Sequence, residues 1–257
     1  MELGKKQLDI VILVTFFFIS TLFVWKFKLN NLITTFLYLI VPSIYLLIRY
    51  ERFRKRILVF ALPLGIVLSI AMQYIADYNK VWIWPIDPSL PTIFTHVPLE
   101  SFLWFPAWAI LLVAIYQIFF DFTHSSQKPS KNYKWFIVIL FGYFLAFTAW
   151  LSIGSPRVEY AYARFFALPA IGPLVFVLIK SPALVPRFFK FSLVMLIFLL
   201  IYEIIGLRLR HWAFPGEYSS LVNIFGISIP IEEFVIWIAL GGASLASYFE
   251  TFMDDLK

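Results

Sequence analysis

Long apolar runs, separated by short polar stretches, follow one another along the whole chain. Most are long enough to cross the roughly 30 Å of a bilayer's hydrocarbon core as helices. They are continuously apolar, without the alternation typical of membrane-spanning strands. The pattern therefore predicts an all-α fold, a polytopic transmembrane helical bundle with about eight spans. We expect the spans at Ile10–Trp25, Leu29–Ile48, Ile57–Ala76, Leu99–Phe120, Trp135–Gly154, Tyr160–Ile179, Phe191–Leu207 and Ile231–Phe249.

Composition agrees with a membrane protein. Of the 257 residues, 61% are hydrophobic and only 14% are charged, whereas a soluble domain is roughly 45–50% apolar. The chain has no cysteine and three histidines, none of which is spaced from another as metal ligands are. We therefore expect neither a disulfide nor a metal site.

The positive charges lie in short loops between the apolar runs. Eight crossings put both termini on one side, and that side carries two thirds of the 21 lysine and arginine residues. By the positive-inside rule it is the cytoplasmic side. The net charge of +6 is thus explained by membrane orientation, and we expect no nucleic-acid partner.

Two halves of the chain carry matching motifs. Trp82-Ile83-Trp84-Pro85 is matched by Trp212-Ala213-Phe214-Pro215, and Pro98-Leu99-Glu100 by Pro230-Ile231-Glu232-Glu233. The polar stretch 122–134 lies between the halves. We expect a first repeat at 1–121, a linker at 122–134 and a second repeat at 135–257, with four spans in each. Because four is even, the repeats should be parallel, with a shared site at their interface.

The Pro-x-Glu motifs are the first candidates for chemistry. Proline and acids both suit the first turn of a helix, so helix-start chemistry alone is one explanation of Glu100, Glu232 and Glu233. Carboxylates at the mouth of an apolar span are costly, however, and often functional. Burial can keep such an acid protonated near neutral pH and able to donate its proton.

Further candidates surround these acids. Glu203 interrupts the seventh span, where pairing with a nearby arginine is the structural alternative. Aromatic rings attract cations, by roughly 2 kcal/mol or more when desolvated. An interfacial aromatic belt is the alternative explanation of the rings near the acids. The candidate substrate-binding residues are Glu203 together with Trp82, Trp84, Phe102, Trp104, Trp212, Phe234 and Trp237.

The paired Trp-containing connectors and Pro-x-Glu motifs resemble the membrane-integral lycopene cyclase family. The resemblance is to the fused, two-repeat form of the heterodimeric bacterial and archaeal enzymes and covers most of the chain. Val97-Pro98-Leu99-Glu100 and Ile229-Pro230-Ile231-Glu232-Glu233-Phe234 carry it. Ser101 stands where the family usually has a second acid, and four spans per half is one more than its minimal subunit has.

The resemblance implies a bacterial or archaeal cell-membrane enzyme that cyclises a linear polyene without redox chemistry. An acid protonates the terminal double bond of the ψ end group, the neighbouring alkene closes a six-membered ring, and a base removes a proton to give a β or ε ring. We expect Glu232 as the acid and Glu233 or Glu100 as its partner, with no cofactor. The alternatives are a hydratase or other isoprenoid enzyme, a transporter, and a membrane protein without chemistry.

Overall fold

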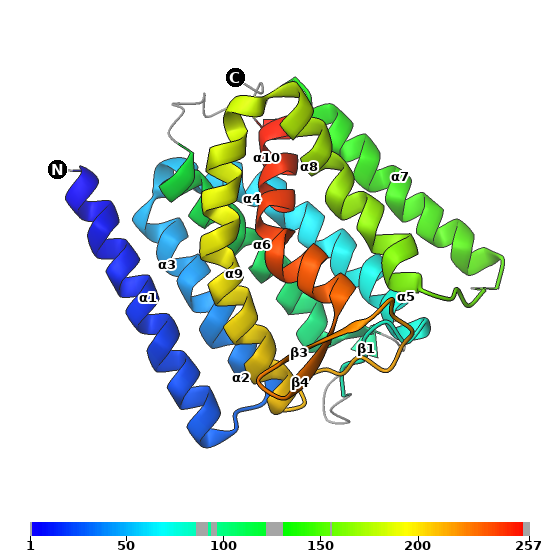
Figure 1. The fold of residues 1–257 in the computed structure, drawn as a ribbon. Coiled ribbons are helices and arrows are strands. Elements are labelled where there is room, and N and C mark those ends of the chain that lie inside the picture. The colour runs from blue at the N-terminus through cyan, green and yellow to red at the C-terminus, as the bar shows by residue number, and fades with distance from the viewer. Residues whose placement is uncertain (1, 86–91, 94–96, 122–130, 155, 254–257) are drawn as a thin grey trace.

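A computed structural model describes residues 2–85, 92–93, 97–121, 131–154 and 156–253 (Figure 1). Most of the chain forms long helices packed side by side into one bundle. Within these described ranges, seven helices are long and apolar enough to cross a membrane, and a bent pair near the end of the chain makes an eighth if it is one span. The prediction of a helical bundle with about eight membrane-length apolar helices is therefore confirmed, and these helices indicate an integral membrane protein.

The first four spans agree closely with the apolar runs. The fourth occupies Leu99–Phe120, which are its predicted bounds. Several spans contain a π-helical segment, labelled η, that continues an α-helix. The elements are α1 (Glu2–Phe27), α2 (Asn31–Thr35), η1 (Phe36–Ile40), α3 (Val41–Arg49), α4 (Glu51–Val67), η2 (Leu68–Met72), α5 (Gln73–Tyr78), α6 (Leu99–Ile115) and η3 (Tyr116–Phe120).

The last four spans follow the same plan, with one difference in the eighth. That span bends by 54° between its two segments, because the π-helical part ends at Ala239 and, after Leu240, a new helix starts at Gly241. The elements are α7 (Tyr133–Ser152), η4 (Ala163–Ala167), α8 (Leu168–Lys180), the 3₁₀ turn η5 (Pro182–Leu184), α9 (Val185–Arg208), η6 (Glu233–Ala239) and α10 (Gly241–Met253). Residues 122–130 of the predicted linker lie outside the described residues.

Two short hairpins correct the all-α prediction. β1 (Thr92–Ile93) pairs with β2 (Val97–Pro98), and β3 (Leu221–Ile224) pairs with β4 (Ile227–Pro230), both antiparallel. The turn of the second hairpin is Phe225-Gly226, with φ of +51° and +79°. Two positive φ values suit the tight two-residue turns of hairpins. Each hairpin immediately precedes a Pro-x-Glu helix.

The hairpins and the connectors before them cap one end of the bundle, and the termini lie at the other end (Figure 1). The two connectors are joined by a pair of backbone hydrogen bonds between Ile83 and Ala213, of 2.9 and 3.0 Å. Tyr218 also donates from its hydroxyl to the carbonyl of Val81. Hydrogen bonds therefore join the caps of the two halves over the end of the bundle.

Helices α4 and α6 cross in close contact at Gly65 and Pro106. A Cβ added at Gly65 of α4 would lie 2.3 Å from the Cα of Pro106 of α6. Glycine is thus required for the crossing, because any larger residue would overlap the backbone of α6. This packing fixes the position of α6, whose first turn carries Glu100.

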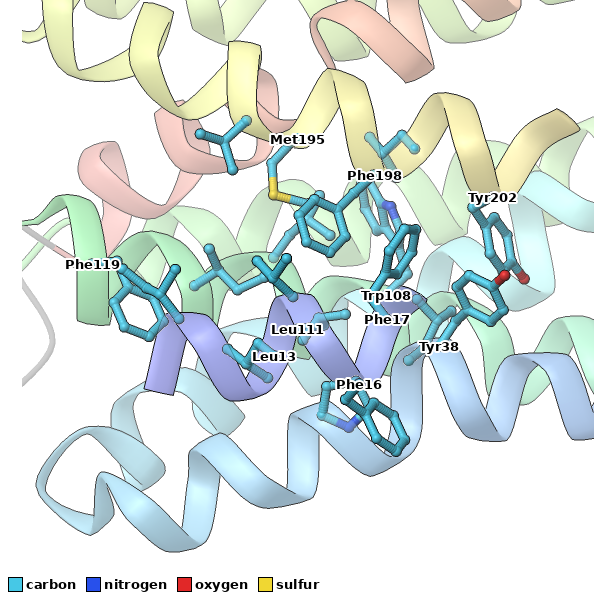
Figure 2. Close-up of a pocket in the computed structure, with 18 of the residues that line it drawn as sticks. Leu13, Phe16, Phe17, Tyr38, Trp108, Leu111, Phe119, Met195, Phe198 and Tyr202 are labelled. Atoms are coloured by element: carbon cyan, nitrogen blue, oxygen red, sulfur yellow. The ribbon is translucent and has the colours of Figure 1, made fainter. Parts of the chain in front are cut away.

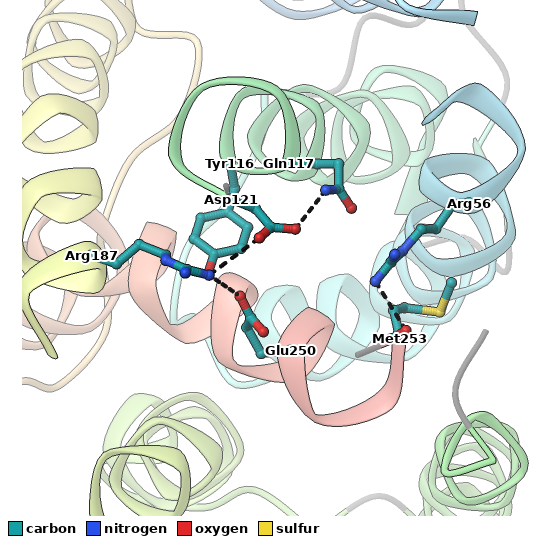
Figure 3. Close-up of polar contacts among 7 residues, drawn as sticks. All are labelled: Arg56, Tyr116, Gln117, Asp121, Arg187, Glu250 and Met253. Atoms are coloured by element: carbon teal, nitrogen blue, oxygen red, sulfur yellow. Dashed lines mark hydrogen bonds and ion pairs between the residues drawn. The ribbon is translucent and has the colours of Figure 1, made fainter. Parts of the chain in front are cut away.

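A buried polar cluster joins the helices at the end of the bundle where the termini lie (Figure 3). Arg187 of α9 forms ion pairs with Asp121, at 3.2 Å, and with Glu250 of α10, at 3.0 Å. Tyr116 donates a hydrogen bond to the same Glu250 carboxylate. Arg56 of α4 donates to the carbonyl of Met253, at 2.9 Å. The cluster compensates the buried charges and ties α4, α9 and α10 to the end of the fourth span.

Candidate functional site

A small pocket of about 40 Å³ lies beneath the caps, and we call it the acid pocket. Two carboxylates reach it from different helices, Glu203 from α9 and Glu233 from the start of η6. The rest of its wall is aromatic. The lining residues are Trp82, Trp84, Trp104, Phe105, Tyr162, Glu203, Trp212, Phe214, Glu233 and Trp237.

Glu203 is held by a tryptophan of the cap that follows its own helix. The indole nitrogen of Trp212 donates to the Glu203 carboxylate at 2.7 Å. The first half has the neutral version of this contact, in which Trp82 donates to the amide oxygen of Gln73 at 2.8 Å. In both halves the tryptophan is nine residues after its acceptor, so the same local geometry serves an acid in one half and an amide in the other.

The chain closes tightly around the Trp212 indole. A Cβ added at Gly206, one turn after Glu203, would lie 2.1 Å from the ring. The outer edge of the indole therefore packs closely against α9 at Gly206, and its N–H is directed at Glu203. The other half carries Ala76 in the corresponding place before Trp82.

Glu233 has a separate partner. Tyr162, just before η4, donates from its hydroxyl to the Glu233 carboxylate at 2.5 Å. Both side chains are buried. The first half has Ser101 at the place of Glu233, and its hydroxyl donates to the carbonyl of Pro98 at 3.2 Å. The acid pocket is therefore acidic on the side of the second half only.

Glu232 and Glu100 are buried outside the lining of the acid pocket. One oxygen of Glu232 accepts from the backbone nitrogen of Ser219 at 2.7 Å, which ties the start of the eighth span to its cap. The other oxygen of Glu232 and one oxygen of Glu100 have no partner among the described residues. Buried carboxylate oxygens are normally hydrogen-bonded, so both acids retain an unused acceptor.

Stacked indoles line the acid pocket and continue beyond it to Trp108. The rings of Trp104 and Trp237 lie 5.5 Å apart at an interplanar angle of 24°, and those of Trp108 and Trp237 lie 4.4 Å apart at 16°. Above them, Trp84 stacks on Trp212 at 5.9 Å. The wall of the acid pocket is thus rich in π-electron density, which favours a cation.

Tyr218 of the second cap lies near the acids. Burial raises the pKa of its phenol, and the carboxylates of Glu233 and Glu232 raise it further. The phenol is therefore neutral over the physiological range. It serves as a hydrogen-bonding link between the caps rather than as a base.

The structure brings seven of the eleven sequence-predicted site residues into one pocket. They are Trp82, Trp84, Trp104, Glu203, Trp212, Glu233 and Trp237. Phe102 and Phe234, like Glu100 and Glu232, are not among the lining residues.

Tyr162 is the functional candidate that the sequence did not single out. Its only signal is a polar hydroxyl at the start of an apolar run, and many tyrosines in this chain share that position. Its role depends on a contact with Glu233, 71 residues later in the chain. Such a long-range contact leaves no pattern in a single sequence.

Compared with known proteins, the chain matches no family model, no curated protein and no solved structure.

Proposed function

We propose that this membrane protein is a carotenoid cyclase of the lycopene cyclase type, which closes the linear ψ end group of a polyene to a six-membered ring. The observation that carries the proposal is the acid pocket. Two carboxyl groups from α9 and η6 share a small cavity otherwise lined by aromatic rings. Proton transfer to an alkene needs an acid and a base, and the resulting cation needs a dry, electron-rich wall.

The two carboxyl groups can divide these roles. Two carboxylates in one apolar pocket repel each other, so a single shared proton is the favoured state. One group then serves as the acid while the other is ionised. Glu233 keeps its position through Tyr162 and Glu203 through Trp212. We assign the acid and base roles to this pair, and to Glu232 the role of holding the cap through Ser219.

The reaction balances without an added reductant or oxidant. The protonated carboxyl gives its proton to the terminal carbon–carbon double bond, which leaves a tertiary carbocation. The neighbouring double bond attacks this cation, so one carbon–carbon bond forms and the positive charge moves into the new ring. The ionised carboxyl then removes a ring proton and a double bond forms. One proton enters and one leaves, and the carboxyl pair again holds one proton.

We also propose that the two halves of the chain are copies of one four-span repeat. Backbone strain recurs at matching positions, because Lys28 and Tyr160 have φ of +47° and +49°, and Lys80 and Arg210 have φ of +62° and +59°. Positive φ is uncommon outside glycine, so two such matches support a common local fold in the halves.

Contacts between the halves are reciprocal in the same way. Ile83 and Ala213 are matching residues and hydrogen-bond to each other in both directions, as residues beside a two-fold axis do. Arg187 of the second half binds Asp121 at the end of the fourth span, and Arg56 of the first half binds Met253 at the end of the eighth. This reciprocity supports parallel repeats related by an axis along the bundle.

Pigment analysis tests the proposed function. The chain is expressed in a bacterial host that accumulates lycopene, membrane insertion is verified, and carotenoids are separated by chromatography. Monocyclic or bicyclic carotenes are the expected products, and their double-bond position identifies the β or ε ring. Hydroxylated products would replace the cyclase by a hydratase that uses the same acids. Unchanged lycopene in membranes that contain the protein would overturn the proposal.

A further inference from the structure

Two apolar cavities meet at Trp108 of α6, whose side chain lines both. The α1 cavity, of about 230 Å³, lies among α1, η1, α6 and α9 (Figure 2). The α7 cavity, of about 630 Å³, lies among α4, α7, α8 and α10. Both are far larger than the acid pocket, and the proposed reaction at the acids uses neither.

The α7 cavity adjoins the acid pocket through two aromatic side chains. Trp237 lines both spaces. Phe166 lines the α7 cavity, and its ring centroid lies 5.2 Å from that of Trp82 and 5.6 Å from that of Tyr162, which line the acid pocket. Phe166 and Trp237 therefore form the partition between the cavity and the acids.

The partition on the side of the α1 cavity is fixed more firmly. Tyr202 lines that cavity, stacks on Trp212 at 5.4 Å and accepts a hydrogen bond from Trp104 at 2.7 Å. Displacing Tyr202 would break a buried hydrogen bond, which is costly. Among the described residues, no hydrogen bond holds the side chain of Phe166 or Trp237, and both are held by aromatic packing. A rotamer change can therefore open the path to the α7 cavity.

The outer wall of the α7 cavity faces away from the bundle. Helix α7 lies at the edge of the molecule (Figure 1), and only Phe136, Leu140 and Phe147 of its side chains are buried. A helix that buries so few side chains is held weakly, because the association of helices in a bilayer depends on close packing and hydrogen bonds between them. Hydrocarbon can therefore enter from the bilayer beside α7.

We propose that the α7 cavity binds the linear hydrocarbon chain of the polyene substrate, with the end group passing Phe166 and Trp237 to reach Glu233. This inference rests on the proposed function. Its grounds are the volume of the cavity, its apolar wall, its continuity with the acid pocket and the weakly packed helix on its outer side. The smaller α1 cavity has the fixed partition and takes no substrate.

Polyene retention tests the assignment independently of turnover. The background is Glu233→Gln, which we expect to block proton transfer while leaving the cavity intact. Leu140→Trp fills the α7 cavity from its outer helix, and the matched control Leu13→Trp fills the α1 cavity from α1. Each protein is purified from lycopene-accumulating membranes, and lycopene retained per protein is measured by absorbance. We expect at least a tenfold loss for Leu140→Trp and less than a twofold change for Leu13→Trp.

A second variant and a stability measurement keep the test decisive. Ala170→Phe fills the α7 cavity from α8, and thermal midpoints show that each variant is folded. The cavity assignment would be overturned if Leu140→Trp and Ala170→Phe retained as much lycopene as the Glu233→Gln background, or if only Leu13→Trp lost it. Either result would leave the cyclase proposal intact. If the wild-type chain does not cyclise lycopene and its Glu233→Gln variant does not retain it, the proposed function is overturned instead.

Discussion

At the scale of single residues, the most informative contrast is between adjacent glutamates. Glu232 turns toward the cap, where Ser219 binds it, and Glu233 turns toward the acid pocket, where Tyr162 binds it. Neighbouring residues on a helix point about 100° apart. The sequence therefore showed that the two acids would differ, but not which of them would face the pocket.

Amide variants separate the roles of these acids. We expect Glu233→Gln and Glu203→Gln each to lower cyclisation by about 10²–10⁴-fold, because each removes a group that gives or takes a proton. Glu232→Gln should lose less than tenfold, because its amide oxygen can still accept from Ser219. Product formation per protein in isolated membranes is the measurement. Equal inactivity of Glu232→Gln and Glu233→Gln would return the acid role to Glu232.

His211 makes stability depend on pH. Burial lowers the pKa of this imidazole below its usual value of 6.5, although the hydrogen bond to the Leu29 carbonyl opposes the shift. The ring nitrogen Nε2 donates to that carbonyl at 2.9 Å, and Nδ1 has no partner among the described residues. Protonation would therefore create a buried charge for which the described residues supply no ion-pair partner.

The direction of this pH dependence is set by which state of the chain takes up a proton. As pH falls below 6.5 the unfolded chain binds a proton at His211 that the folded chain does not, so stability falls, by at most about 1.4 kcal/mol per pH unit. Thermal midpoints between pH 7.5 and 5 measure the effect. His211→Gln, which can still donate to Leu29, should reduce the slope. An unchanged slope would show that other groups set the pH dependence.

At the scale of elements, hydrophobic runs predicted the spans because burial in lipid requires long, continuous apolar segments. The structure of the caps was harder to predict from the sequence. The Leu221–Ile224 and Ile227–Pro230 strands are short, and their pairing depends on the Phe225-Gly226 turn rather than on a long alternating pattern. The bend at Gly241 was also missed, because the apolar pattern continues through it. Seven of the ten residues that line the acid pocket were candidates from the sequence, since tryptophans and acids are conspicuous in an apolar chain, but only Glu233 of the three expected catalytic acids lies there.

The crossing of α4 and α6 gives a prediction at this scale. Gly65→Ala should lower stability by roughly 1–3 kcal/mol, because the added methyl group overlaps the backbone of Pro106 and the helices must separate. Gly142→Ala in α7 is the matched control. A Cβ there meets nothing within 4 Å, so the alanine should leave the thermal midpoint unchanged or raise it slightly through its better helix propensity. Equal midpoints for both variants in detergent would contradict the tight crossing.

At the scale of the whole molecule, the Arg187 cluster ties the two halves together at the end opposite the caps. Arg187→Met removes the shared partner of two buried carboxylates, Asp121 and Glu250. Removing one partner of a buried ion pair costs roughly 3–5 kcal/mol. We expect a large drop in the thermal midpoint, with Arg187→Lys recovering part of it because the charge remains. A wild-type midpoint for Arg187→Met would show that the cluster is not needed to hold the halves.

The unequal halves have a kinetic consequence. Gln73 and Ser101 stand where the second half has Glu203 and Glu233. A cyclase of the kind we propose would therefore hold one proton-transferring pair. A polyene with two identical ends then cannot be finished in a single residence. It must dissociate, reverse its direction in the bilayer and bind again. For the proposed cyclase we therefore expect distributive conversion, in which the half-converted carotenoid builds up first under excess substrate and the fully converted one follows after a lag.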